Sequence, residues 1–254
     1  MIIQIPSKRR IAATFSAKAN GYQEEAYIQK QILALLVPFV KTASGFSLPW
    51  LDAGCGAGGM AGLLKENKVP VRLMRTDLAY GMLRCRRSPG AVQSDIEGLP
   101  FRDGVFGGAV VASVLHWLED PSKGMGELFR VLAAGGALVF SGFLQGSFSE
   151  IFSLRQERNL SVPVRLPSRD DFSALLAASG FDCRTYLSFE KQYRFASAMD
   201  ALKYMSETGS TAVEGRRLSL REIIKLCREY ENNHSEPSGV PLSINVAYGL
   251  ALKK

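Results

Sequence analysis

A glycine-rich turn directly after a short apolar segment constrains the fold more than any other feature of this chain. Residues 49–53 are typical of a strand, residues 54–59 contain four glycines, and residues 60–66 are typical of a helix. Glycine permits tight turns and lets the backbone approach a ligand closely. A strand, a turn of this kind and a helix in succession therefore predict an α/β fold with a ligand at the turn.

Strands and helices alternate along the rest of the chain. The run of small apolar residues at 105–113 is typical of a central parallel strand that is buried on both faces. We expect the helix that begins at residue 23 to end near Pro38, and Gly135-Gly136 to end the helix that begins at Pro121. Strands are expected at 49–53, 71–76, 91–93, 105–113, 137–142, 181–195 and 241–252, and helices at 23–40, 60–66, 80–86, 121–132, 168–179, 198–207 and 220–230. This alternation predicts a doubly wound, mostly parallel seven-stranded sheet.

Length and surplus segments predict one domain with a helical lid. A chain of 254 residues can fold as a single α/β domain. The expected sheet leaves over an N-terminal helical cap at 1–48 and two lid segments at 145–167 and 198–239. Open α/β folds bind ligands at the carboxyl ends of their strands, so we expect these segments to cover that edge.

Composition argues against several classes of function. The four cysteines are scattered without a CxxC pair and there are only two histidines, so no metal site is expected. The G-x-S-x-G turn of a serine hydrolase does not occur. The net charge of +7 favours an anionic partner, but it is too small to indicate nucleic acid. No apolar stretch approaches the roughly 20 residues of a membrane span, and we expect a cytoplasmic monomer.

Three acids lie where the expected strands end. Asp52 precedes Gly54 by two residues, Asp77 ends the second strand, and Asp95 follows the third. The glycines also fit the G-x-G-x-x-G fingerprint of dinucleotide-binding enzymes. Asp77 suits a ribose hydroxyl group, whether the ligand is a dinucleotide or another adenosine compound without a pyrophosphate. Asp52 separates the two possibilities, because a carboxylate there suits a cationic ligand with an amino group and would repel a pyrophosphate. Asp95 and an apolar neighbour can bind the amino group of an adenine and cover its face.

The segment Asp52-Ala53-Gly54-Cys55-Gly56-Ala57-Gly58 resembles the D-x-G-x-G-x-G loop of the class I S-adenosylmethionine-dependent methyltransferases. This resemblance implies a Rossmann-like fold and S-adenosylmethionine as the cofactor. The residues that it implies for cofactor binding are Asp52, Gly54, Gly56, Gly58, Asp77, Leu78, Asp95 and Ile96.

Motifs outside this loop resemble the malonyl-acyl-carrier-protein O-methyltransferases of biotin synthesis. They run in order along nearly the whole chain and include 8–16, 95–100, Leu115-His116-Trp117, Gln145-Gly146-Ser147, Arg165-Leu166-Pro167 and Pro241-Leu242-Ser243. The resemblance implies methylation of the free carboxylate of a malonyl thioester. It also implies an acyl carrier protein as partner, which presents the malonyl group on phosphopantetheine.

The implied acceptor needs no general base. A carboxylate with a pKa near 4 is already ionised at pH 7, so the protein must align the reactants and exclude water. Arg165 is our candidate for binding the acceptor carboxylate, because its planar guanidinium suits that group. Tyr22 is a candidate to close over the sulfonium end of the cofactor, and His116 to contact the substrate.

Two alternatives stay open at this stage. The chain could be a methyltransferase of the same fold that acts on another small acceptor, such as a quinone precursor or a free dicarboxylic acid. It could also be a binding or regulatory protein that keeps the fold without turnover. The intact glycine loop, Asp77 and Asp95 argue against the second alternative. The fold alone does not show which acceptor is methylated, so the first alternative stays open.

Overall fold

The computed structural model shows seven strands in one sheet, in the order β3-β2-β1-β4-β5-β7-β6. The strands are β1 (Trp50–Ala53), β2 (Leu73–Asp77), β3 (Ala91–Gln93), β4 (Phe106–Ala112), β5 (Leu132–Phe143), β6 (Phe181–Phe195) and β7 (Val240–Lys253). β1 to β5 are parallel, and β7 is antiparallel to both β5 and β6. The expected mostly parallel sheet is confirmed. The residues that the structure describes are 6–45, 48–85, 90–160, 162, 164, 166–210 and 218–254.

Helices connect and cover these strands. They are α1 (Lys8–Glu25), α2 (Tyr27–Ala43), α3 (Gly59–Glu66), α4 (Tyr80–Arg84), α5 (Pro121–Val131), α6 (Ser149–Glu157), α7 (Arg169–Ala178), α8 (Ala198–Glu207) and α9 (Leu220–His234). Short 3-10 helices, η1 (Ile96–Gly98) and η2 (Leu115–Trp117), follow the ends of β3 and β4. Over the described ranges, no helix is long and apolar enough to cross a membrane.

Apolar side chains fill both faces of the sheet. On one face, Met125 of α5 and Phe172 of α7 pack in one cluster with Phe140 of β5. On the other face, Val40 of α2 and Met60 of α3 pack in a second cluster, with residues of β1, β4 and β5. Burial of apolar surface on both faces explains the uninterrupted apolar character of β4. The helices thus cover both faces, and the doubly wound arrangement is confirmed.

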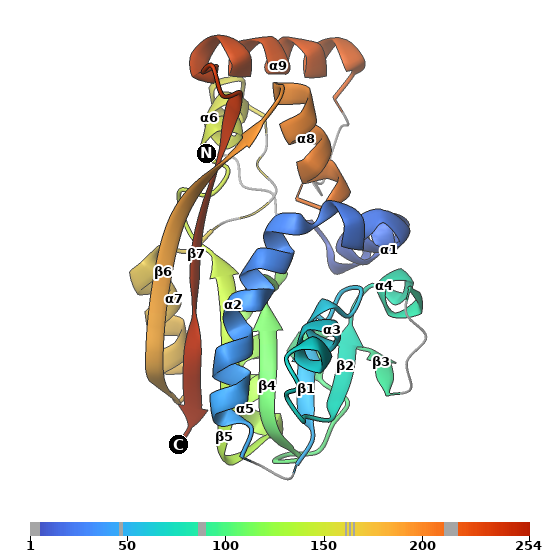
Figure 1. Cartoon of the computed structure of the whole chain (residues 1–254), viewed down its shortest axis with the longest axis vertical. Coiled ribbons are helices and arrows are strands. Elements are labelled where there is room, and N and C mark those ends of the chain that lie inside the picture. Colours follow the sequence, from blue (N-terminus) through green and yellow to red (C-terminus); the bar gives the residue numbers. More distant parts are fainter. Residues whose placement is uncertain are drawn as a thin grey trace.

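The antiparallel pair of β6 and β7, whose connection contains α8 and α9, extends beyond the rest of the sheet. β5 pairs with β7 only from Ala137 to Phe143, whereas β6 and β7 stay paired up to Phe195 and Val240. Around the end of this strand pair that lies beyond the rest of the sheet, α6, α8 and α9 contribute to a third apolar cluster, at the top of Figure 1. The segments expected to be surplus to the sheet therefore have a core of their own.

Several expected boundaries were wrong. The helix expected to begin at residue 23 begins at Tyr27, because the residues up to Glu25 belong to α1. α2 continues through Pro38 to Ala43, since Pro38 is on the exposed side of the helix, where water can satisfy a backbone carbonyl that loses its partner. α9 continues to His234 instead of ending near Tyr230. α5 ends at Val131, and the Gly135-Gly136 pair lies within β5 rather than at the end of the helix.

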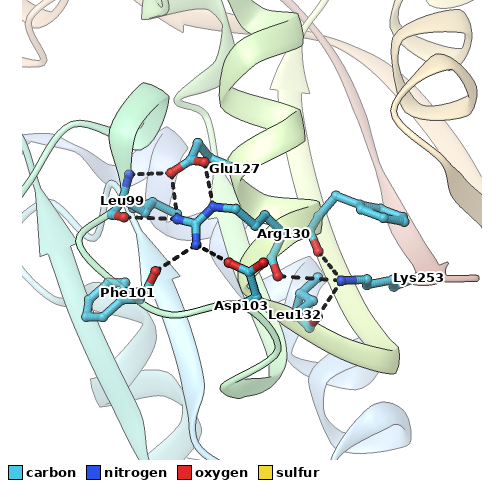
Figure 2. A network of polar contacts seen from close by, with 8 residues as sticks. Leu99, Phe101, Asp103, Glu127, Arg130, Leu132 and Lys253 are labelled. Carbon is cyan, nitrogen blue, oxygen red and sulfur yellow. Dashed lines mark hydrogen bonds and ion pairs between the residues drawn. The ribbon is translucent and has the colours of Figure 1, made fainter.

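Lys253 caps the C-terminal end of α5. Its ammonium group donates to the carbonyl oxygens of Phe129 and Leu132, at 2.7 Å each (Figure 2). Carbonyl groups at a helix C-terminus lack partners within the helix and carry partial negative charge, so a lysine stabilises them. The last strand of the chain therefore caps the helix that precedes β5.

Candidate active site

A cavity of about 400 Å³ lies at the carboxyl ends of β1, β2 and β4. Its volume falls within the usual range for small-molecule sites. The lining comes from the loops after these strands, from α1 and from the residues just after α8. It includes Tyr22 and His116 and seven of the eight residues expected to bind the cofactor, and Gly58 lies in the same loop.

The glycine loop between β1 and α3 adopts a conformation that other residues rarely take. Gly54 and Gly58 have φ angles of +72° and +81°. A Cβ atom at Gly54 would lie 2.5 Å from the side chain of Val114, and one at Gly58 would lie 2.7 Å from the side chain of Arg75. Gly54 is therefore required by packing as well as by its backbone angle, whereas at Gly58 the backbone angle is the main constraint, since the end of the Arg75 side chain could shift.

Asp77 is held in place by the same loop. Its Oδ2 accepts the backbone N–H of Gly56 and its Oδ1 accepts the backbone N–H of Ala79, at 2.8 Å each. Burial raises the pKa of this carboxyl group, and the two hydrogen bonds oppose that shift. The carboxylate has a fixed orientation beside the cavity and can still accept hydrogen bonds from a ligand.

Asp52 is a buried acid on β1 whose Oδ2 has no hydrogen-bond partner among the described residues. It lies opposite Arg75 in the register of β1 and β2. Burial raises the pKa of Asp52 to about 7, Arg75 opposes the shift, and the charge of Asp77 adds to it. A buried carboxyl group of this kind can be satisfied by a cationic group of a ligand.

Asp95 lies beside the cavity, at the start of η1. Its Oδ1 accepts the backbone N–H of Glu97 at 2.9 Å, and its Oδ2 binds the ammonium group of Lys8 at 2.7 Å. Ile96 is buried and Leu78 is half-buried, and both line the same cavity. The structure thus places an acid and two apolar side chains together, as adenine binding requires, but the acid already has a cationic partner that the sequence did not indicate.

His116 is on η2, after the end of β4. Its ring packs against Trp117 and Phe143, with ring centroids 5.1 Å and 5.3 Å away. Burial lowers the pKa of His116 to about 3, so the imidazole is neutral at physiological pH. Its buried Nδ1 has no partner in the described part of the chain. His116 can therefore hydrogen-bond a ligand, but it is a very weak base.

Tyr22 reaches the cavity from α1. A Cβ atom at Gly56 would lie 4.0 Å from the Tyr22 ring, so the ring faces the glycine loop. Burial and the charge of Asp77 raise the pKa of the Tyr22 hydroxyl group, which therefore stays protonated. The hydroxyl group is available as a hydrogen-bond donor. Arg165, the candidate for binding the acceptor carboxylate, lies outside the described residues.

Sequence reasoning missed a polar pair at the lid side of the cavity. The hydroxyl group of Tyr204, on α8, donates to Oε1 of Gln29, on α2, at 2.7 Å. Gln29 lines the cavity and is 9% exposed. A glutamine among the apolar residues of 27–43 is a weak signal in the sequence. No sequence pattern could have indicated its partner, which lies 175 residues away.

Comparison with known proteins defines the class of this protein. Residues 51–140 match the family described as "Methyltransferase domain", and they contain the glycine loop, Asp77, Asp95 and His116. The fold is also that of geranyl diphosphate C-methyltransferase from Streptomyces coelicolor A3(2), solved with S-adenosyl-L-homocysteine. The two share 15% identity and superpose with a TM-score of 0.52, over 86% of this chain and 75% of that one. The fold, the glycine loop and the family match define a methyltransferase that uses S-adenosylmethionine.

Two curated relatives narrow the comparison further. The chain is 28% identical to a malonyl-[acyl-carrier protein] O-methyltransferase of Geobacter sulfurreducens, over 96% of this chain and 98% of the relative. It is 26% identical to the protein of the same name from Serratia marcescens, over 98% of this chain and 97% of the relative. The similarity thus extends well beyond the methyltransferase domain, into α1, α8 and the β6–β7 strand pair.

Proposed function

We propose that this enzyme transfers a methyl group from S-adenosylmethionine to the free carboxylate of a malonyl group carried by acyl carrier protein, an early step towards the pimeloyl chain of biotin. The observation that carries the proposal is the similarity to malonyl-[acyl-carrier protein] O-methyltransferases over nearly the full length of both chains. This similarity includes the segments that cover the cavity. Those segments, rather than the cofactor loop, distinguish one acceptor from another on a common fold.

The residues of the cavity suit the cofactor. Asp52 can bind a cationic amino group, Asp77 can accept from ribose hydroxyl groups, and Asp95 can accept from the adenine amino group. Bound S-adenosylmethionine supplies a methyl group on a positively charged sulfur, which a nucleophile can take up directly. We assign Leu78 and Ile96 to the apolar contacts of the adenosine part.

The chemistry of a carboxylate acceptor agrees with the state of His116. A malonyl carboxylate is already ionised at neutral pH, so it does not need a base to remove a proton. His116 has a pKa lowered to about 3 and can offer only a hydrogen bond. The enzyme is thus expected to act by alignment and by exclusion of water, which α1 and the aromatic side chains beside the cavity provide.

Neutral hydrogen-bond donors line the cavity beside the residues assigned to the cofactor. The Tyr22 hydroxyl group and the Gln29 side chain line the cavity on the side of α1 and α2, and Ser210 lines it from the residues after α8. The Tyr204 hydroxyl group fixes the Gln29 amide by binding its oxygen, which leaves the amide nitrogen as the donor towards a ligand. We infer that these groups hold a carboxylate or a thioester carbonyl.

The experiment that tests this function compares malonyl-acyl carrier protein, malonyl-CoA and free malonate at equal concentrations. Because the +7 chain and an acidic carrier protein attract each other, we expect the carrier-bound substrate to give the highest kcat/KM. That advantage should shrink with added salt, since the Debye length is about 10 Å at 0.1 M. Equal turnover of free malonate would indicate a small-acceptor methyltransferase, and binding of the cofactor without any turnover would indicate a non-catalytic protein.

A further inference from the structure

The ammonium group of Lys8 joins α1 to the acids that follow β3. Its Nζ lies 2.7 Å from Asp95 Oδ2, 2.8 Å from Glu97 Oε2 and 3.8 Å from Glu119 Oε2. The Glu97 side chain is only 4% exposed, and its Oε1 accepts the backbone N–H of Glu119 at 2.8 Å. Removing a cation from a buried carboxylate is costly, so Lys8 stabilises this arrangement of acids.

The other end of α1 is fixed to the glycine loop. Gln23 Nε2 donates to the carbonyl oxygen of Ala57 at 2.8 Å. In an ideal helix, the positions of Lys8 and Gln23 are about 22 Å apart along the axis. Between them, Phe15 and Tyr22 line the cavity. α1, which lies above α3 and α4 in Figure 1, therefore crosses the cavity and is held on both sides of it.

We propose that Lys8 is a positioning residue that couples closure of α1 to binding of the adenosine part of the cofactor. The proposal rests on the role given above to Asp95. Both oxygens of Asp95 are already oriented, one by Lys8 and one by the backbone of Glu97. Lys8 thereby helps to fix the direction in which the carboxylate can accept a hydrogen bond from an adenine amino group.

This coupling acts in both directions. With α1 in place, Asp95 is presented to adenine as an oriented carboxylate. Residues of η1 and α1 line the same cavity, so an adenosine group bound there would contact both and would favour the closed position of the helix. By thermodynamic linkage, closure of α1 raises the affinity for the ligand by a certain factor. Binding of the ligand raises the equilibrium constant for closure by the same factor.

Lys18 offers a matched control on the same helix. Its Nζ lies 3.0 Å from Glu207 Oε1 on α8, and its side chain is 29% exposed, against 27% for Lys8. Of the described residues, Lys18 and Glu207 are not among those that line the cavity. Substitution of Lys18 thus removes an ion pair from α1 and leaves the acids beside the cavity unchanged.

The test is calorimetric titration of S-adenosylhomocysteine into the wild type, K8M, K8R and K18M. We expect K8M to weaken binding about tenfold, within the usual range for coupled sites. K8R keeps a cation and should bind within about threefold of the wild type, as should K18M. Equal losses in K8M and K18M would overturn the proposal, because they would show a general effect of loosening α1.

A double-mutant cycle with D95N separates coupling from simple destabilisation. If Lys8 acts through Asp95, K8M should cause only a small further loss of affinity in the D95N background. A full, additive loss would contradict the proposal. If a thermal melt shows that K8M does not unfold cooperatively and is therefore misfolded, K8Q replaces it in the same titrations. None of these titrations contains an acceptor, so their outcome is independent of whether malonyl-acyl carrier protein is the substrate.

Discussion

The backbone N–H of Gly56 donates to Asp77 Oδ2 at 2.8 Å, and this hydrogen bond joins the loops that follow two adjacent strands. Gly56 follows β1 and Asp77 ends β2. The bond fixes the orientation of the acid within the protein itself, so a ligand does not have to order that side chain on binding. A preorganised site of this kind binds its ligand at a smaller entropic cost.

Asp77→Asn should weaken binding of S-adenosylhomocysteine about 10- to 100-fold, which corresponds to the loss of a hydrogen bond to a charged group. The asparagine keeps one acceptor oxygen but directs an NH₂ group at a backbone N–H donor. Calorimetric titration measures the change. Asp120→Asn is a suitable control, because Asp120 caps α5 and does not line the described cavity. Unchanged affinity in D77N would remove Asp77 from the cofactor site.

Binding of S-adenosylmethionine should release a proton from Asp52 near neutral pH. The pKa of Asp52 is raised to about 7, mainly by burial, so much of this carboxyl group is protonated in the free enzyme below that pH. A cationic amino group of the ligand favours the ionised form, and affinity should therefore increase as the pH rises towards about 8. Titrations in buffers of different ionisation enthalpy measure the proton release. The D52N variant should show neither effect, and a pH-independent affinity of the wild type would contradict this role of Asp52.

His116→Gln should retain much of the wild-type kcat. The imidazole has a pKa lowered to about 3 and the acceptor is already ionised, so neither the substitution nor titration of His116 should govern the rate. For the wild type, kcat at saturating substrates should vary little between about pH 6 and pH 8, the range in which an ordinary histidine titrates. A loss approaching 10⁴-fold in H116Q, the upper range for removal of a general acid or base, would show that the mechanism needs a base.

Arg130→Met should lower the free energy of unfolding by about 2 kcal/mol, discounted for the partial exposure of this side chain. The guanidinium group binds Glu127, Asp103 and the carbonyl oxygens of Leu99 and Phe101 (Figure 2). It thereby fixes the segment that follows η1. Urea denaturation measures the change, with R158M as a comparison, since Arg158 pairs with Glu229 far from this loop in the fold. An equal effect of R158M would argue against a special contribution of Arg130.

The sequence was sufficient to predict elements whose signals are local. β6 and α8 have the expected bounds, because β6 alternates in character and Ser197 caps α8 by accepting the N–H of Asp200. The glycine loop was predictable for the same reason, since its positive φ angles require glycine at particular positions. The errors at Pro38 and at the end of α5 arose from solvent exposure and from the distant cap by Lys253.

The side-chain contacts of the site could not be predicted in this way. The pairs Lys8–Asp95 and Gln29–Tyr204 join residues 87 and 175 positions apart, and they depend on how the helices pack over the sheet. The raised pKa of Asp52 likewise depends on burial by surrounding elements rather than on its neighbours in sequence. Sequence motifs therefore predicted which residues bear the chemistry, whereas the structure shows the partners of those it describes.

The most direct test of the proposed function is the intact mass of malonyl-acyl carrier protein after incubation with the enzyme and methyl-labelled S-adenosylmethionine. We predict that the malonyl group gains a single labelled methyl group, that mild alkali releases it as methanol, and that acetyl-acyl carrier protein, which lacks the free carboxylate, stays unlabelled. Label on acetyl-acyl carrier protein, or label on a small acceptor with none on the malonyl carrier, would contradict the proposed reaction.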